Sequence, residues 1–112
     1  GAIANAGVAV SMTLTEPTGE SETIMDVQTA QRLAAYMQNN VDKQYGARRF
    51  GEYAVGAKSG TAQQDSGLAH SVFTGFIADN EMPIAFFVIA EHAGSGQGVA
   101  MQAAAAIVQN LK

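Results

Sequence analysis

The run Lys58-Ser59-Gly60-Thr61 places a cation and two hydroxyl groups within a short stretch of chain. An ammonium group and hydroxyl donors that converge on one point are suited to binding an anion such as a carboxylate. Gly60 has no Cβ, which allows backbone amides beside it to approach a ligand closely. We therefore expect an anion-binding site at these residues.

A phosphate-binding P-loop is the first alternative, because Gly56-Ala57-Lys58-Ser59 is superficially similar to that motif. The P-loop requires a glycine directly before its lysine, and Ala57 takes that place here. It also requires a helix after the lysine, whereas this chain continues with a polar loop and a strand pattern. The sequence therefore argues against a nucleotide phosphate site.

The same run resembles the third motif, Lys-Thr/Ser-Gly, of the penicillin-binding transpeptidases and the serine β-lactamases. Two more segments are similar to penicillin-binding proteins in the expected order. Residues 1–8 resemble their Ala-Ile-Ala-Asn-Gly-Gly segment, and residues 70–76 resemble their His-Ser/Ala-Trp-Phe-Thr-Gly-Phe strand, with Val72 where tryptophan is common. The resemblance covers essentially the whole chain and implies that residues 1–112 are one unit, the C-terminal part of a transpeptidase domain of the high-molecular-mass, membrane-anchored class.

This resemblance implies roles for the residues that match. Lys58, Ser59 and Thr61 match positions that bind the carboxylate of the peptidoglycan stem peptide or of a β-lactam. The backbone amide of Thr61 matches one of two oxyanion-hole donors, which stabilise the charge that develops on the carbonyl oxygen during acyl transfer. Gly60 keeps the strand flat enough for substrate to lie alongside it. The resemblance thus predicts substrate binding by all four residues and a catalytic part for Lys58 and for the Thr61 amide.

The nucleophile of the family comes from a Ser-x-x-Lys motif, and a Ser-x-Asn motif assists proton transfer. No serine of this chain has lysine three positions later or asparagine two positions later. We therefore expect the chain to form one wall of the active site and to be inactive alone. The resemblance implies that the parent protein is a peptidoglycan D,D-transpeptidase at the extracytoplasmic face of the bacterial cytoplasmic membrane. The six serines of the chain, none of which begins either motif, are Ser11, Ser21, Ser59, Ser66, Ser71 and Ser95.

Two other functions stay open on the residues alone. A serine β-lactamase or a β-lactam sensor shares the Lys-Ser/Thr-Gly motif, although the opening Ala-Ile-Ala-Asn segment and the Thr-Gly-Phe that ends at Phe76 favour the transpeptidases. A binding or assembly module without catalytic activity is the alternative from another class, and the missing nucleophile favours it.

The amino-acid composition argues against several classes of ligand. The chain of 112 residues carries a net charge of −4, the wrong sign for the phosphate contacts that dominate nucleic-acid affinity. It contains no cysteine, which excludes disulfides and thiolate metal sites. His70 and His92 have no carboxylate at metal-ligand spacing. We expect no nucleic acid, no metal and no cofactor.

The elements that must position the site follow from the hydrophobic pattern. Residues 1–7 resemble the last turns of a helix, which suggests that the chain begins inside a domain. Apolar residues three or four apart predict a helix from Asp26, its N-cap, to Val41, and a second helix with one apolar stripe. The order predicts an α+β fold, an antiparallel sheet with helices packed on it. Strands are predicted at 8–15, 53–62 and 70–78, and an apolar run predicts one more at 84–90. The apolar stripe of the second predicted helix consists of Val99, Ala103, Ile107 and Leu111.

The last two predicted strands are joined by a short turn and should form an antiparallel hairpin. The continuous apolar run of residues 84–90 indicates a strand that is covered on both faces. In the family, this strand has a neighbour from the N-terminal part of the domain, which is missing here. We expect the open edge to be paired by that missing part, by a second copy of the chain in a homo-oligomer or strand-swapped dimer, or by residues 8–15.

Overall fold

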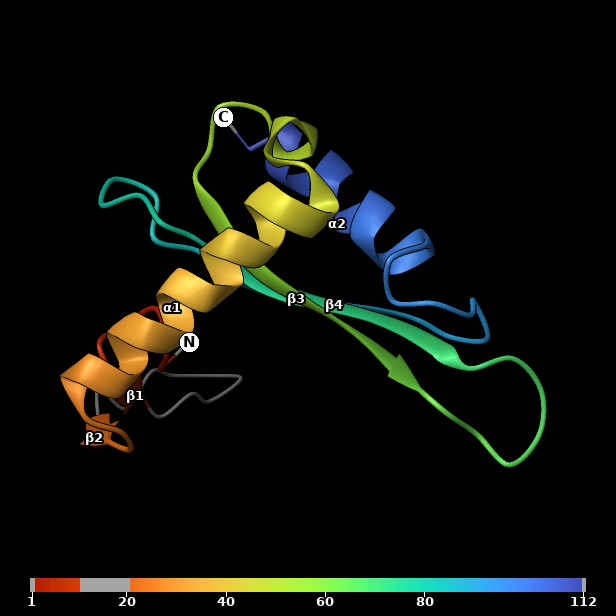
Figure 1. The fold of residues 1–112 in the computed structure, drawn as a ribbon, viewed down its shortest axis with the longest axis horizontal. Helices are drawn as coiled ribbons and strands as arrows, with labels where there is room; N and C mark the ends of the chain where they lie inside the picture. The colour runs from red at the N-terminus through yellow and green to blue at the C-terminus, as the bar shows by residue number, and fades with distance from the viewer. Residues whose placement is uncertain (1, 11–20, 112) are drawn as a thin grey trace, which may run out of the picture. The chain divides into compact units, whose positions relative to one another are not determined.

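The computed structural model describes residues 2–10 and 21–111, and Figure 1 shows its elements. The chain divides into two compact units, residues 1–36 and residues 37–112. None of the helices in the described residues is long and apolar enough to cross a membrane.

The first unit contains a small antiparallel pair of strands, β1 (Val8–Val10) and β2 (Ser21–Thr23). Residues 2–7 form consecutive turns rather than a regular helix. These turns end where Gly7, at a φ of 92°, donates its N–H to the carbonyl of Ala2 at 2.8 Å. The strand predicted at 8–15 is confirmed for Val8–Val10, and the rest of it lies outside the described residues. The sequence pattern did not predict β2.

Helix α1 (Val27–Asn40) begins at the residue that the sequence predicts. The Asp26 carboxylate accepts hydrogen bonds from the backbone N–H of Thr29 at 2.9 Å and from its hydroxyl at 2.7 Å. This is the geometry of an N-cap, which supplies an acceptor to an N–H group that has no partner inside the helix. The predicted helix start is confirmed.

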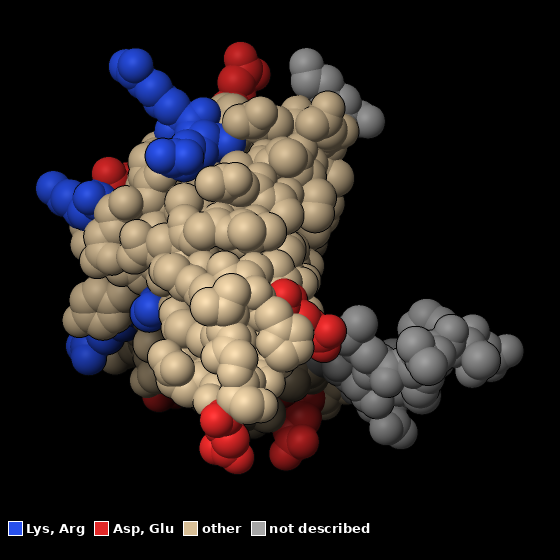
Figure 2. All heavy atoms as spheres, turned by 90° about the vertical axis from the view of Figure 1, so that its right-hand side faces the viewer, with Lys and Arg blue, Asp and Glu red and all other residues tan. Residues whose placement is uncertain are grey.

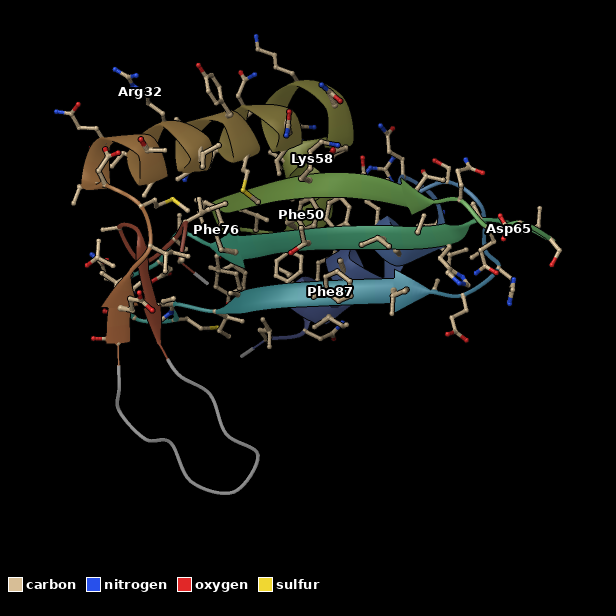
Figure 3. The ribbon with its side chains drawn as sticks, turned by 90° about the horizontal axis from the view of Figure 1, so that it is seen from below. Arg32, Phe50, Lys58, Asp65, Phe76 and Phe87 are labelled. Atoms are coloured by element: carbon tan, nitrogen blue, oxygen red, sulfur yellow. The ribbon has the colours of Figure 1, made fainter. Side chains whose placement is uncertain are left out.

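The second unit is built on an antiparallel sheet of strands β3 (Val55–Ala62), β4 (His70–Ile77) and β5 (Ala85–Ala90), in that order. The predicted hairpin of the last two strands is confirmed. Helix α2 (Val99–Gln109) packs on one face of the sheet and lies behind the strands in Figure 3. The α+β class and the antiparallel sheet with packed helices are therefore as predicted.

Side chains of alternate residues form the core between the sheet and α2. Ser59 lies opposite Phe73, and Phe73 lies opposite Val88, so these three share the face that α2 covers. Phe73 is fully buried. The buried cluster of this unit consists of Val41, Tyr45, Phe50, Val55, Ala57, Phe73, Ile77, Ala100, Met101, Ala104, Ala105 and Val108.

The other face of the sheet, here called the open face, is exposed at β5 in the described chain. Phe87 and Ile89 of β5 are 64% and 50% exposed, and Figure 3 labels Phe87 on the side of the sheet away from α2. The prediction that residues 84–90 are covered on both faces is wrong for this chain, because α2 covers one face only. Within the first unit, Val8–Val10 pair with β2.

Helix α2 turns a different stripe to the sheet from the one predicted. Val99 and Ile107 are 50% and 53% exposed, whereas Ala100, Ala104 and Val108 are buried. The reason lies at the start of the helix, where the N–H of Ala100 donates to the hydroxyl of buried Ser71 in β4 at 3.2 Å. That bond places Ala100, rather than Val99, against the sheet. The small side chains of Ala104 and Ala105 are buried, so the helix lies close to the sheet there.

The segment before β3 forms a π-helical turn, η1 (Val41–Tyr45), and a 3-10 turn, η2 (Ala47–Phe50). Both turns are anchored on Phe73. The Tyr45 ring meets it edge-on, with ring centroids 5.2 Å apart, and the Phe50 ring stacks on it at 6.0 Å. Arg48 and Arg49 are exposed. Most atoms on the face drawn in Figure 2 belong to uncharged residues, in keeping with 14% charged residues.

Candidate functional site

Strand β3 carries all four residues that the sequence predicts for the site. Lys58 and Thr61 are exposed, and Ser59 and Gly60 are half-buried. Because side chains alternate along a strand, Lys58 lies on the open face of the sheet while Ser59 and Thr61 lie on the face toward α2. The cation and the hydroxyls therefore reach a common ligand only at the edge of the strand.

The outer edge of β3, the side away from β4, is where these groups meet. The side-chain amide of Asn40 donates to the Ala57 carbonyl at 3.2 Å, and the Ser59 N–H donates to the Tyr45 hydroxyl at 3.0 Å. In an antiparallel strand every second residue directs its N–H and C=O to the same side. The N–H of Thr61 therefore points to this outer edge, two residues beyond the part that Asn40 and Tyr45 occupy.

The ammonium group of Lys58 also lies at the outer edge of β3. Its Nζ donates to the carbonyl of Ser59 at 2.5 Å. This carbonyl belongs to the row of backbone groups that face outward, so the positive charge lies close to the peptide bonds on either side of Ser59. An anion at the edge is attracted by this charge and receives hydrogen bonds from the edge donors.

The Ser59 hydroxyl is held by the same tyrosine that binds its backbone. Tyr45 OH lies 3.0 Å from Ser59 Oγ, and Tyr45 is only 3% exposed. Ser59 thus has its N–H and its hydroxyl bound to Tyr45 and its carbonyl bound to Lys58. The residue at the centre of the site is fixed in one conformation before any ligand arrives.

The loop between β5 and α2 supports the end of β3 from the face toward α2. The N–H of Gly96 donates to the Thr61 hydroxyl at 3.3 Å. Gly96 also packs directly on the backbone of Gly60, since a Cβ at Gly96 would lie 2.1 Å from the Gly60 oxygen. Ser71 anchors this loop by donating its hydroxyl to the carbonyl of Ser95 at 2.6 Å.

Three residues of the site were missed by the sequence analysis, namely Asn40, Tyr45 and Gly96. Asn40 lies 17 positions before its partner Ala57, and Tyr45 lies 14 positions before its partner Ser59. The hydrophobic pattern identifies their segment only as the end of a helix. Gly96 belongs to a glycine-rich loop whose place against β3 depends on the tertiary fold. No local signal in the sequence marks any of them.

The site offers hydrogen-bond donors and one positive charge to a ligand at the edge of β3. Such an arrangement binds a carboxylate and stabilises negative charge that develops on a carbonyl oxygen. The part of the edge from Thr61 onward can also pair with an extended ligand as an additional antiparallel strand. The Lys58, Ser59, Gly60 and Thr61 roles stay predictions, and the chain has no Ser-x-x-Lys motif that provides a nucleophile.

Solved structures that align with this chain include penicillin-binding proteins and a D,D-transpeptidase domain. Penicillin-binding protein A from M. tuberculosis, solved as an imipenem acyl-enzyme complex, aligns with a TM-score of 0.75 at 20% identity, over 96% of this chain and 28% of that chain. PBP2 of Pseudomonas aeruginosa, in complex with WCK 5153, aligns with a TM-score of 0.66 at 27% identity, over 96% of this chain and 26% of that one.

The D,D-transpeptidase domain of a peptidoglycan glycosyltransferase from Eggerthella lenta aligns with a TM-score of 0.70 at 24% identity, over 99% of this chain and 31% of that chain. The chain therefore spans less than one third of the solved structures that it matches. A comparison with curated proteins finds no match.

The sequence as a whole matches a protein family as well. The match extends over residues 1–110 and includes every strand and helix described above. The family is described as the penicillin binding protein transpeptidase domain. The chain thus belongs to the family of penicillin-binding protein transpeptidase domains.

Proposed function

We propose that this chain is the C-terminal part of a peptidoglycan D,D-transpeptidase domain and supplies the carboxylate-binding and oxyanion-stabilising wall of its active site. The parent protein cross-links stem peptides of the cell wall by acyl transfer, at the extracytoplasmic face of the cytoplasmic membrane, and is acylated by β-lactams. Its serine nucleophile lies outside these 112 residues. The chain alone is inactive.

One observation carries the proposal, the outward direction of the Thr61 N–H at the open end of an edge strand. Asn40 and Tyr45 occupy the preceding positions of that edge, so the first backbone donor beyond them is that of Thr61. Lys58 lies beside it and brings a positive charge. These are the groups that an acyl-transfer site needs for the anionic end of its ligand and for the developing oxyanion.

Intact-mass measurement after incubation with a penicillin tests this proposal. We expect a covalent penicilloyl adduct on the full-length protein that contains this chain and none on residues 1–112 alone. We expect Lys58→Ala to slow acylation of the full-length protein by about tenfold or more, the effect of losing one charged hydrogen bond. Lys43→Ala is the matched control, since Lys43 is an exposed lysine of η1.

The outcomes separate the competing functions. A stable adduct supports a transpeptidase or a sensor, whereas rapid hydrolysis of the adduct indicates a β-lactamase. No adduct on the full-length protein contradicts the proposal and favours the module without catalytic activity. An equal effect of Lys58→Ala and Lys43→Ala contradicts the specific role of Lys58.

A further inference from the structure

We propose that Tyr45 is a positioning residue of this site, which holds Ser59 so that the Ser59 hydroxyl proton is directed at the carboxylate of the ligand. The inference rests on the proposed function above. It concerns a residue outside the Lys-Ser-Gly-Thr motif. The motif and Tyr45 are brought together only by the fold.

The directions of the hydrogen bonds follow from what each group can do. The backbone N–H of Ser59 is a donor only, so the Tyr45 oxygen, 3.0 Å away, accepts from it. The phenol keeps one proton of its own. Ser59 Oγ is also 3.0 Å from that oxygen. When Tyr45 donates to Ser59 Oγ, the Ser59 hydroxyl proton is released from Tyr45 and is free to turn to a ligand.

The reverse direction is less favourable. If Ser59 donates to Tyr45, the phenol proton needs a different acceptor. In the part of the chain that the structure describes, both hydrogen-bond contacts of the Tyr45 hydroxyl are with Ser59. Tyr45 is 3% exposed, and a buried donor without an acceptor is costly. The burial of Tyr45 therefore selects the direction that frees the serine proton.

Tyr45 is itself held rigidly, which a positioning residue requires. Its ring contacts the fully buried ring of Phe73 edge-on at 5.2 Å, with an interplanar angle of 72°. The turn that carries it is closed by a hydrogen bond of 2.8 Å from the N–H of Gly46 to the carbonyl of Val41. Tyr45 thus fixes the site to the aromatic core of the unit.

The same contact has a second effect on ligand choice. Because the Tyr45 hydroxyl occupies the N–H of Ser59, a bound peptide cannot use that N–H as a ladder donor. The ligand can pair with the edge of β3 only from Thr61 onward. Tyr45 therefore sets the register in which an extended ligand lies beside β3.

The test compares two phenylalanine variants of the full-length protein. Tyr45→Phe keeps the ring on Phe73 and removes only the hydroxyl. Tyr53→Phe is the matched control, because the Tyr53 hydroxyl also makes a hydrogen bond, to the Leu111 carbonyl at 2.5 Å, and its ring packs against the same core. Acylation rates are measured with a penicillin that has its free carboxylate and with the methyl ester of the same penicillin.

We expect Tyr45→Phe to lower the ratio of the carboxylate rate to the ester rate about tenfold, the effect of one hydrogen bond. The ratio of the two rates does not depend on the fraction of protein that is folded. In a Ser59→Ala background, Tyr45→Phe should not lower this ratio further, because the hydroxyl that Tyr45 positions is absent. Tyr53→Phe should leave both rates unchanged.

The inference is overturned if Tyr45→Phe matches Tyr53→Phe, or if it slows the carboxylate and the ester equally. In both cases the unmodified protein is still acylated, so the proposed function stands. If the unmodified protein is acylated by neither compound, the proposed function is wrong, and the role of Tyr45 falls with it.

Discussion

Gly96→Ala places a methyl group against the peptide bond that joins Gly60 to Thr61. A Cβ at Gly96 would lie 2.1 Å from the Gly60 oxygen and 2.8 Å from the Gly60 carbonyl carbon. Non-bonded heavy atoms are most stable at about 3.5–4.0 Å, so loop and strand must separate by about 1 Å or more. The N–H of Thr61 belongs to this same planar peptide unit, so moving the oxygen also turns the proposed oxyanion donor.

The expected loss of activity follows from that displacement. A misplacement of about 1 Å in a catalytic group costs about 100-fold in rate. We therefore expect Gly96→Ala to lower the rate of penicillin acylation of the full-length protein by about 100-fold. Overpacking of this kind also destabilises a fold by about 1–3 kcal/mol, which thermal unfolding will record.

Gly94→Ala controls for the loss of stability. Gly94 has a φ of 83° and no atom within 4 Å of a Cβ, so alanine there is strained without touching β3. The strain costs about 1–2 kcal/mol, similar to the overpacking at Gly96. Stability should fall in both variants, whereas acylation should fall only in Gly96→Ala. Equal losses of acylation, or none in Gly96→Ala, would refute the reasoning.

Three further predictions concern the scaffold. Ser71→Ala should lower the free energy of unfolding by about 1–3 kcal/mol, because the Ser95 carbonyl and the N–H of Ala100 lose a buried partner. Phe73→Ala should cost about 3–5 kcal/mol, because Phe73 is the centre of the aromatic core. The pKa of Asp26 is lowered below its ordinary value of 3.8, first by the hydrogen bond from the Thr29 hydroxyl and then by that from the Thr29 backbone N–H. The ionised Asp26 carboxylate therefore stabilises the fold above pH 3.8, and this stabilisation is lost as the pH falls through the folded-state pKa.

Denaturant titration measures the free energy of unfolding of Ser71→Ala and Phe73→Ala. Ser66→Ala, in an exposed loop, is the control. A Ser71→Ala change as small as that of Ser66→Ala contradicts the anchoring role of Ser71. For Asp26, thermal unfolding from about pH 5 to about pH 2 is compared with Asp26→Asn, which keeps a capping oxygen but does not titrate. Identical pH dependence of the two proteins contradicts the pKa shift.

Local sequence signals predicted most of the helices and strands well. The change from helical to alternating spacing located α1, β3, β4, β5 and α2, and Asp26 marked the start of the first helix. The rotation of α2 was not predictable from its own residues. Its first turn is bound to β4 through Ser71 and Ala100, which are separated by 29 positions in the sequence.

The site was predictable only in part for the same reason. The motif itself is local and identifies Lys58 through Thr61 as a group. Its support is not local, because Tyr45 and Gly96 approach β3 from other elements. The exposure of Phe87 was missed because a continuous apolar run indicates what a strand can bury and not what is present to cover it.

The structure of the full-length protein acylated by a penicillin tests the central claim most directly. The account predicts that the penicillin carboxylate lies within hydrogen-bonding distance, about 2.7–3.2 Å, of the Ser59 or Thr61 hydroxyl, and that the acyl carbonyl oxygen accepts from the Thr61 N–H. It also predicts that Tyr45 keeps its contact with Ser59 in the complex. An adduct whose carboxylate and carbonyl oxygen both lie away from β3 would contradict the account.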